Sequence, residues 1–169
     1  MAFWQCYYHL VWATKNRAAL ITPELEPILF GYTVNRAAEH EVMILAINGW
    51  TDHLHVVASI PPKQAVADLV KSLKGASAHY LNHLPDRRLS FAWQQGYGVL
   101  TFSAKNLDAA ISYVQLQKEH HNRQTANPWL ERYAESDEGP VRPGLAGVEQ
   151  VKAVREEEVT YGALGELPF

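Results

Sequence analysis

Apolar positions in the first forty residues follow two different periods. Residues 3–14, FWQCYYHLVWAT, are aromatic and β-branched, a composition typical of a β-strand. Apolar residues between Leu25 and Tyr32 recur with helical spacing, and the preceding Thr22-Pro23-Glu24 is typical of a helix start. We therefore predict a first strand, followed by a helix that extends to about His40.

The next segment has the pattern of a β-hairpin. We expect a second strand over residues 42–47, a two-residue turn at Asn48-Gly49, and a third strand that Pro61-Pro62 ends after Ile60. Period-two alternation divides this third strand into two faces. One face carries Leu54, Val56, Ala58 and Ile60, and the other carries Thr51, His53, His55, Val57 and Ser59.

The remaining pattern completes a fold of the α+β class. A helical stripe covers residues 66–81, a strand is expected over residues 91–103, and a last helix over residues 105–123. The order β-α-β-β-α-β-α predicts a ferredoxin-like split βαβ sandwich, with an antiparallel sheet and an additional C-terminal helix. We assign residues 1–133 to this domain and residues 134–169 to an acidic tail, irregular or partly helical.

Charge and cysteine content limit the possible partners and compartment. The chain of 169 residues has a net charge of −3, which argues against a nucleic-acid partner. However, residues 1–133 hold 12 Lys and Arg against 10 Asp and Glu, whereas the tail holds 3 against 8. The domain is therefore mildly basic, although its charge is low for DNA binding. The single cysteine and the absence of a signal peptide or long apolar run predict a cytoplasmic protein with no membrane contact.

His53 and His55 are the first candidates for chemistry. Side chains two residues apart on a strand point the same way and lie roughly 6.6 Å apart, so both imidazoles can converge on one metal ion. A buried pair that only satisfies hydrogen bonds is the competing interpretation. Val57 occupies the position where a histidine-triad enzyme needs a third histidine. Asp52 points to the opposite face by alternation, and we interpret it as a turn residue more readily than as an orienter of His53.

Tyr113 and Gln117 are the second candidates. They are four residues apart on the predicted last helix and therefore share a face. Packing alone would explain a tyrosine beside an apolar arc. A helix after the fourth strand can, however, cover the sheet face of His53 and His55. A phenolic oxygen beside a cation can attack a phosphodiester and form a covalent intermediate.

Further residues could contact DNA, although a simpler interpretation is preferred for each. The candidate phosphate contacts are Lys15, Arg17, Lys63, Lys71, Lys74, Arg87, Arg88 and Lys105. Trp93, Tyr97 and Phe102 could stack on bases, but we expect at least two of them to be core residues. His120 and His121 follow Gln117, and we favour a surface role for both over a metal role.

Five stretches in order resemble one family. They are Tyr8–Lys15 (YHLVWATK), Asp52–Val57 (DHLHVV), Leu73–Ser77 (LKGAS), Phe91–Tyr97 (FAWQQGY) and Tyr113–Gln117 (YVQLQ). The set is similar to the HUH-type single-tyrosine transposases of the smallest bacterial insertion sequences, the IS200-like transposases, whose pattern is His-hydrophobic-His followed by Tyr-x-x-x-Gln. The resemblance covers roughly residues 5–125 and does not extend to the acidic tail.

The resemblance implies a function and a site. Tyr113 would be the catalytic nucleophile, forming a 5′-phosphotyrosine and releasing a 3′-hydroxyl. His53, His55 and Gln117 would hold Mg²⁺ or Mn²⁺, of which manganese suits imidazole ligands better. The partners would be single-stranded DNA with hairpins and a second copy in a homodimer, where Tyr113 can serve the histidines of either chain. No small-molecule cofactor is implied.

Two alternatives stay open. The chain could be a domesticated protein that binds single-stranded DNA hairpins without transposition, although a binding module needs no nucleophile. It could also be an unrelated metal hydrolase that uses the histidine pair to activate water. The sequence shows no clear acidic ligand or base beside His53, which makes the hydrolase the weaker alternative.

Overall fold

The computed structural model describes residues 3–85 and 90–134 as one antiparallel sheet with helices on both faces. The elements are β1 (Tyr7–Ala13), α1 (Glu26–Glu39), β2 (Met43–Gly49), β3 (His53–Ser59), α2 (Val66–Asn82), β4 (Gly98–Phe102), α3 (Leu107–Gln115) and α4 (Gln117–Asn122). Short 3-10 helices, Lys15–Arg17 and Ala104–Asn106, precede α1 and α3. The strand order β2-β3-β1-β4, antiparallel throughout, confirms the predicted ferredoxin-like α+β fold.

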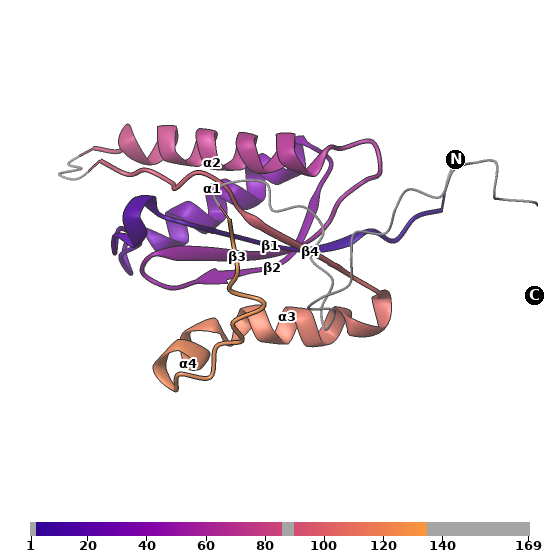
Figure 1. The fold of residues 1–169 in the computed structure, drawn as a ribbon. Coiled ribbons are helices and arrows are strands. Elements are labelled where there is room, and N and C mark those ends of the chain that lie inside the picture. Colours follow the sequence, from indigo (N-terminus) through magenta and orange to yellow (C-terminus); the bar gives the residue numbers. More distant parts are fainter. Residues whose placement is uncertain (1–2, 86–89, 135–169) are drawn as a thin grey trace, which may run out of the picture. The chain divides into compact units, whose positions relative to one another are not determined.

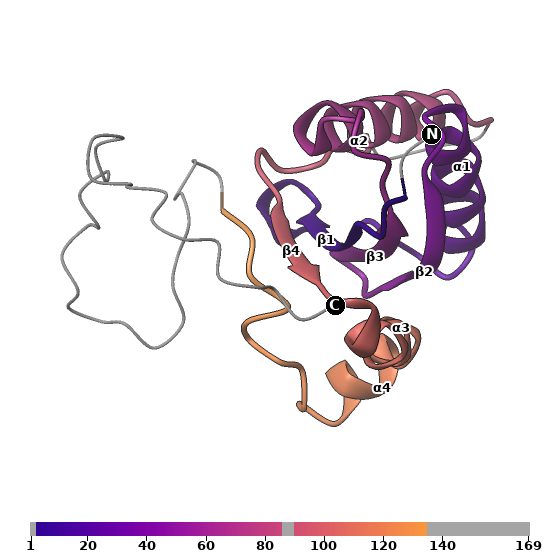
Figure 2. The same cartoon turned by 90° about the vertical axis from the view of Figure 1, so that its right-hand side faces the viewer.

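The two faces of the sheet have different coverings. α1 and α2 lie on one face, whereas α3 lies on the other (Figure 1). Figure 2, turned by 90°, shows α1 and α2 again on the opposite side of the sheet from α3. Leu54, Val56 and Ala58 of β3 pack with Leu69 and Leu73 of α2 in the main core. The predicted alternation along this strand is therefore confirmed, and the histidine face is left for α3.

α3 is attached to the sheet by a small second core. Val114 is fully buried and packs with Ala46 of β2 and Val57 of β3. Ile111 and Tyr113 of α3 pack around this cluster. Burying these apolar groups holds the helix across the face that carries His53 and His55.

The hairpin forms, but its turn is not where the sequence indicated. Asn48 and Gly49 are paired within the ladder, opposite His55 and Leu54. The chain reverses directly after Gly49, over the three residues Trp50–Asp52. Gly49 is required by a close approach, since a Cβ there would lie 2.2 Å from the His53 carbonyl oxygen. Asn-Gly here permits tight packing beside the turn, and the prediction of a two-residue turn was wrong.

Other boundaries also shift. The predicted strand over residues 91–103 is a strand only at Gly98–Phe102, and in the preceding part Trp93 forms an isolated bridge with Thr14, the residue after β1. The predicted helix over residues 105–123 is interrupted at Leu116, where φ is −91° and ψ is 13°. α1 begins at Glu26 after a turn in which the Thr22 hydroxyl accepts a hydrogen bond from Leu25 N.

Part of the sequence interpretation lies outside the described residues. These include Arg87, Arg88 and all of the predicted tail except Ala134, which forms a bridge with Tyr97. Within residues 3–85 and 90–134, no helix is both long and apolar enough to cross a membrane.

Candidate active site

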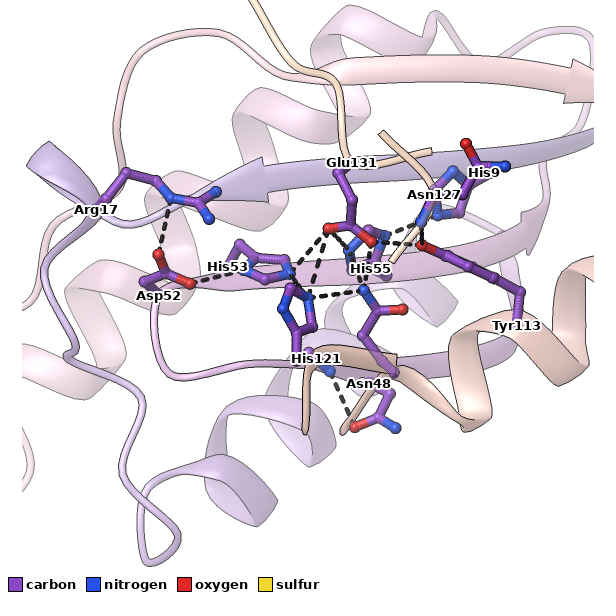
Figure 3. Close-up of polar contacts among 12 residues, drawn as sticks. His9, Arg17, Asn48, Asp52, His53, His55, Tyr113, His121, Asn127 and Glu131 are labelled. Carbon is purple, nitrogen blue, oxygen red and sulfur yellow. Dashed lines mark hydrogen bonds and ion pairs between the residues drawn. The ribbon is translucent and has the colours of Figure 1, made fainter. Parts of the chain in front are cut away.

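His53 and His55 project from β3 side by side and are fully buried, with ring centroids 5.0 Å apart. The Nδ1 atom of His53 lies 2.7 Å from Asp52 Oδ1. Arg17 Nε lies 2.8 Å from the other oxygen of that carboxylate. Asp52 therefore orients His53 (Figure 3), because its position in the turn lets its carboxylate reach the imidazole ring. The sequence alone favoured a simple turn role for Asp52.

His55 is oriented from the neighbouring strand. Its Nδ1 atom lies 2.9 Å from Nε2 of His9 on β1, and the two rings stack at 5.0 Å. Burial, with His55 nearby, lowers the pKa of His9 to about 3, so His9 is neutral at physiological pH. Because both Nδ1 atoms are engaged, the Nε2 atoms of His53 and His55 face the interior of the site. His9 was not singled out from the sequence.

Tyr113 and Gln117 reach the histidines from the helices on this face. The break at Leu116 places Tyr113 in the last turn of α3 and Gln117 at the start of α4. Gln117 is fully buried, and its Nε2 lies 3.0 Å from His55 Nε2. The ring of Tyr113 meets that of His55 edge-on at 6.3 Å. The four residues that the resemblance identified therefore lie together in one chain.

Glu131 occupies the centre of the group, and sequence analysis missed it. Its Oε2 lies 3.0 Å from His55 Nε2 and 3.2 Å from His53 Nε2. Its Oε1 accepts hydrogen bonds from the Tyr113 hydroxyl, at 2.6 Å, and from Gln117 Nε2. An acidic side chain does lie beside His53, contrary to the expectation from sequence. It comes from a segment 76 residues beyond His55, outside every periodic pattern.

His121 also joins the site. Its Nε2 lies 3.1 Å from His53 Nε2, and its ring stacks on Trp50 at 5.3 Å. Its side chain is only 19% exposed. The surface role favoured from the sequence is therefore wrong for His121, because the break at Leu116 turns α4 toward the hairpin end.

The electrostatics of the site depend on Glu131. Burial would raise the pKa of its carboxyl group, but hydrogen bonds from His53 and His55 hold that pKa far below its usual range. Burial lowers the pKa of His55. Burial also opposes charge on His53, but Asp52 and Glu131 together raise the pKa of that imidazole. Burial and the hydrogen bond to Glu131 raise the pKa of Tyr113 to about 12, so its phenol is neutral at physiological pH.

The donor set suits a divalent cation. Ligand atoms of His53, His55 and Glu131 all lie within 4.8 Å of one another. Two ligands about 2.1 Å from a shared ion and at right angles to each other are about 3.0 Å apart, close to the 3.0 and 3.2 Å found here. The buried Oε1 of Gln117 has no hydrogen-bond partner. Rotating this amide by half a turn would place that oxygen toward the imidazoles, as a ligand.

Comparison with known proteins identifies the family. Residues 2–117, more than half of the chain, match the sequence profile of the family described as "Transposase IS200 like". The chain belongs to the IS200-like transposase family. Transposases cleave and transfer DNA strands, so this chain is an enzyme of that class.

Similar proteins share most of the length of this transposase. The ISDra2 transposase TnpA of Deinococcus radiodurans is 29% identical over 127 residues, covering 68% of this chain and 85% of that protein. The transposase for insertion sequence element IS200 of Salmonella typhimurium is 30% identical, covering 75% of this chain and 87% of its own length.

Solved structures agree with the fold of this transposase. A candidate transposase from D. radiodurans is 27% identical, with a TM-score of 0.54 over 69% of this chain and 93% of that one. A REP-associated tyrosine transposase bound to a REP hairpin has a TM-score of 0.56 over 72% of each chain. Because the two sequences are only 13% identical, this match shows similarity of fold alone.

Two of the family-like stretches have structural roles away from the histidines. Lys74 on α2 donates hydrogen bonds to the carbonyl oxygens of Gln94 and Gly96, at 2.7 and 2.5 Å. The Trp93 indole donates to Ser77, and Trp93 and Tyr97 pack on the main core. The core role expected for at least two of the three aromatics is therefore confirmed.

Proposed function

We propose that this transposase nicks and rejoins single-stranded DNA at hairpin ends through a covalent 5′-phosphotyrosine on Tyr113. The observation that carries the proposal is the connection of nucleophile and histidines within one chain. The Glu131 carboxylate accepts a hydrogen bond from the Tyr113 hydroxyl at 2.6 Å. Its other oxygen lies 3.0 Å from His55 Nε2 and 3.2 Å from His53 Nε2. A tyrosine that only filled space would not need this polar connection to a buried histidine pair.

In the cleavage step, the Tyr113 oxygen attacks the scissile phosphorus and forms an O–P bond as the bond to the 3′ oxygen breaks. The phenol begins the step protonated, because burial and the hydrogen bond to Glu131 raise its pKa to about 12, and it gives up its proton in the course of the attack. The 3′ oxygen leaves as a hydroxyl. Attack by a 3′-hydroxyl on the phosphotyrosine reverses the step, so rejoining requires no external energy.

A divalent cation, Mg²⁺ or Mn²⁺, would be held by His53, His55 and Gln117. It would polarise the scissile phosphate and stabilise charge in the transition state. The Nδ1 contacts of Asp52 and His9 keep both Nε2 atoms directed at this position. His9 is buried and neutral, so it orients His55 without adding a charge.

The partners follow from the same assignment. Single-stranded DNA with hairpins is the expected substrate, and the structural relative that holds a REP hairpin supports the choice. A homodimer and a cytoplasmic location are also expected. A domesticated hairpin-binding protein without transposition is the alternative function.

Covalent capture tests the nucleophile. Wild-type protein, Mn²⁺ and single-stranded oligonucleotides that carry the palindromes flanking the coding region should give a denaturant-resistant adduct. Tyr113→Phe should reduce that adduct to background, because only the attacking oxygen is lost. Tyr80→Phe is the matched control, since Tyr80 is 40% exposed on α2, on the opposite face of the sheet.

Three results would contradict the proposal. Adduct formation by Tyr113→Phe would move the nucleophile elsewhere. Hairpin binding by the wild type with no adduct on any of these oligonucleotides would favour the domesticated binding protein. Metal-dependent turnover without an adduct would favour hydrolysis by activated water, for which two histidines and a glutamate are a suitable ligand set.

A further inference from the structure

Glu131 makes polar contacts with more members of the site than any other residue drawn in Figure 3. Oε2 faces the imidazoles of His53 and His55, with His121 Nε2 at 3.7 Å. Oε1 accepts the hydrogen bonds of Tyr113 and Gln117. The carboxylate thus has one oxygen on the metal-ligating side and the other on the nucleophile.

The backbone around Glu131 is held in place by contacts on both sides. The Asn127 carbonyl oxygen accepts hydrogen bonds from Leu130 N and Glu131 N, and Asn127 N donates to the Tyr113 hydroxyl at 3.0 Å. Beyond it, the Arg132 backbone lies directly against Gly98 of β4, where a Cβ would be 2.0 Å from the Arg132 carbonyl oxygen. The segment can reach the site only because position 98 has no side chain.

A carboxylate changes which cation the site can hold. Two imidazoles and an amide favour zinc and the later transition metals, whereas Mg²⁺ and Mn²⁺ prefer oxygen ligands, carboxylates above all. The separations of Oε2 from the two Nε2 atoms, 3.0 and 3.2 Å, match ligands of one ion. The negative charge also offsets part of the cost of placing a divalent ion among buried groups.

We propose that Glu131 is a further ligand of the cation held by His53 and His55, and that its other oxygen positions the Tyr113 hydroxyl beside that cation. This inference rests on the proposed function. It assigns to the segment after α4 a role in both metal choice and nucleophile placement. It also makes the metal site and the nucleophile one connected unit within a single protomer.

Metal binding in the absence of DNA tests the ligand role. Mn²⁺ and Zn²⁺ affinities are measured by calorimetry on the full chain, for wild type, Glu131→Gln and Glu119→Gln. Glu131→Gln keeps the shape and should weaken Mn²⁺ binding by at least roughly tenfold, with a smaller loss for Zn²⁺, which the imidazoles retain. Glu119, 44% exposed in an ion pair with Arg123, is the matched control and should change neither affinity.

A change in the ratio of the two affinities separates ligation from a structural role, which would lower both equally. Unchanged Mn²⁺ affinity in Glu131→Gln, or equal losses for both metals, would overturn the inference. Failure of the wild type to bind Mn²⁺, or unchanged binding in His53→Ala, would instead overturn the metal site of the proposed function. The two failures are therefore distinguishable.

A second variant tests the same role without altering a ligand. Gly98→Ala should displace the Arg132 backbone and, with it, Glu131. We expect its Mn²⁺ affinity to fall as in Glu131→Gln while its circular dichroism spectrum stays that of the folded wild type. A folded Gly98→Ala protein with unchanged Mn²⁺ affinity would contradict the inference.

Discussion

At the scale of single residues, the candidate metal ligands are oriented by neighbouring side chains that contact their far ring nitrogens. His53 and His55 can present Nε2 to a cation only because Asp52 and His9 engage their Nδ1 atoms. The sequence shows the His-x-His pair by spacing alone, since period two requires only local geometry. It does not show His9, which lies in a run of apolar and aromatic residues and reaches His55 only through strand pairing.

Asp52 provides a prediction at this scale. Asp52→Ala removes the acceptor for His53 Nδ1, so the ring loses its fixed orientation, and divalent metal affinity should fall by about ten- to a hundredfold. Calorimetric titration with Mn²⁺ measures the change. Arg17→Ala leaves the Asp52 carboxylate in place and removes an ion-pair partner that is 43% exposed, so it should lower the metal affinity far less. Equal losses in the two variants would contradict an orienting role for Asp52.

At the scale of elements, close packing decides where the site residues lie. The break at Leu116 separates Tyr113 from Gln117, although both still face the histidines. The sequence predicted one continuous helix, because Leu107, Ile111 and Val114 follow helical spacing and neither glycine nor proline occurs between Leu107 and Arg123. The hairpin turn was predicted at Asn48-Gly49 because this dipeptide is a two-residue turn signal. The turn instead spans Trp50–Asp52, and Gly49 allows a close backbone approach at the end of the ladder.

Gly49 gives a prediction for the hairpin. Gly49→Ala introduces a Cβ that would be 2.2 Å from the His53 carbonyl oxygen, so the start of β3 must shift. We expect a loss of about 1–3 kcal/mol in the free energy of unfolding, together with weaker Mn²⁺ binding. Urea denaturation measures the first and calorimetry the second.

Gly31→Ala is the control for this substitution. Gly31 lies within α1, and an added Cβ would have nothing within 4 Å. The free energy of unfolding of this variant should rise by roughly 1 kcal/mol, because alanine has the higher helix propensity. A stable Gly49→Ala protein with wild-type metal affinity would show that the hairpin end tolerates the shift.

At the scale of the whole molecule, one chain brings together the side chains that the proposed reaction uses. Tyr113 and Glu131, which are 18 residues apart in sequence, both lie against the histidines of their own chain. The family resemblance left open whether Tyr113 serves its own chain or a partner. Contacts of this tyrosine with its own Asn127 and Glu131 favour service within the chain.

Mixing inactive variants tests this arrangement. A chain with His53→Ala and His55→Ala keeps its tyrosine, and a chain with Tyr113→Phe keeps its histidines. If each chain uses its own groups, co-expression of the two should leave covalent capture at background, because neither chain has a complete site. Recovery of up to about half of the wild-type adduct would show that Tyr113 acts on the partner's histidines.

The sequence by itself determined the order of strands and the face of β3 that carries the histidines, and its family resemblance made Tyr113 and Gln117 candidates for the site. Each of these follows from short-range periodicity or from motifs that are local in the chain. Only the tertiary structure decided the places of His9, His121 and Glu131. Their roles depend on strand pairing, on a helix break and on a backbone passing over Gly98, and contacts between distant segments leave no periodic trace in a single sequence.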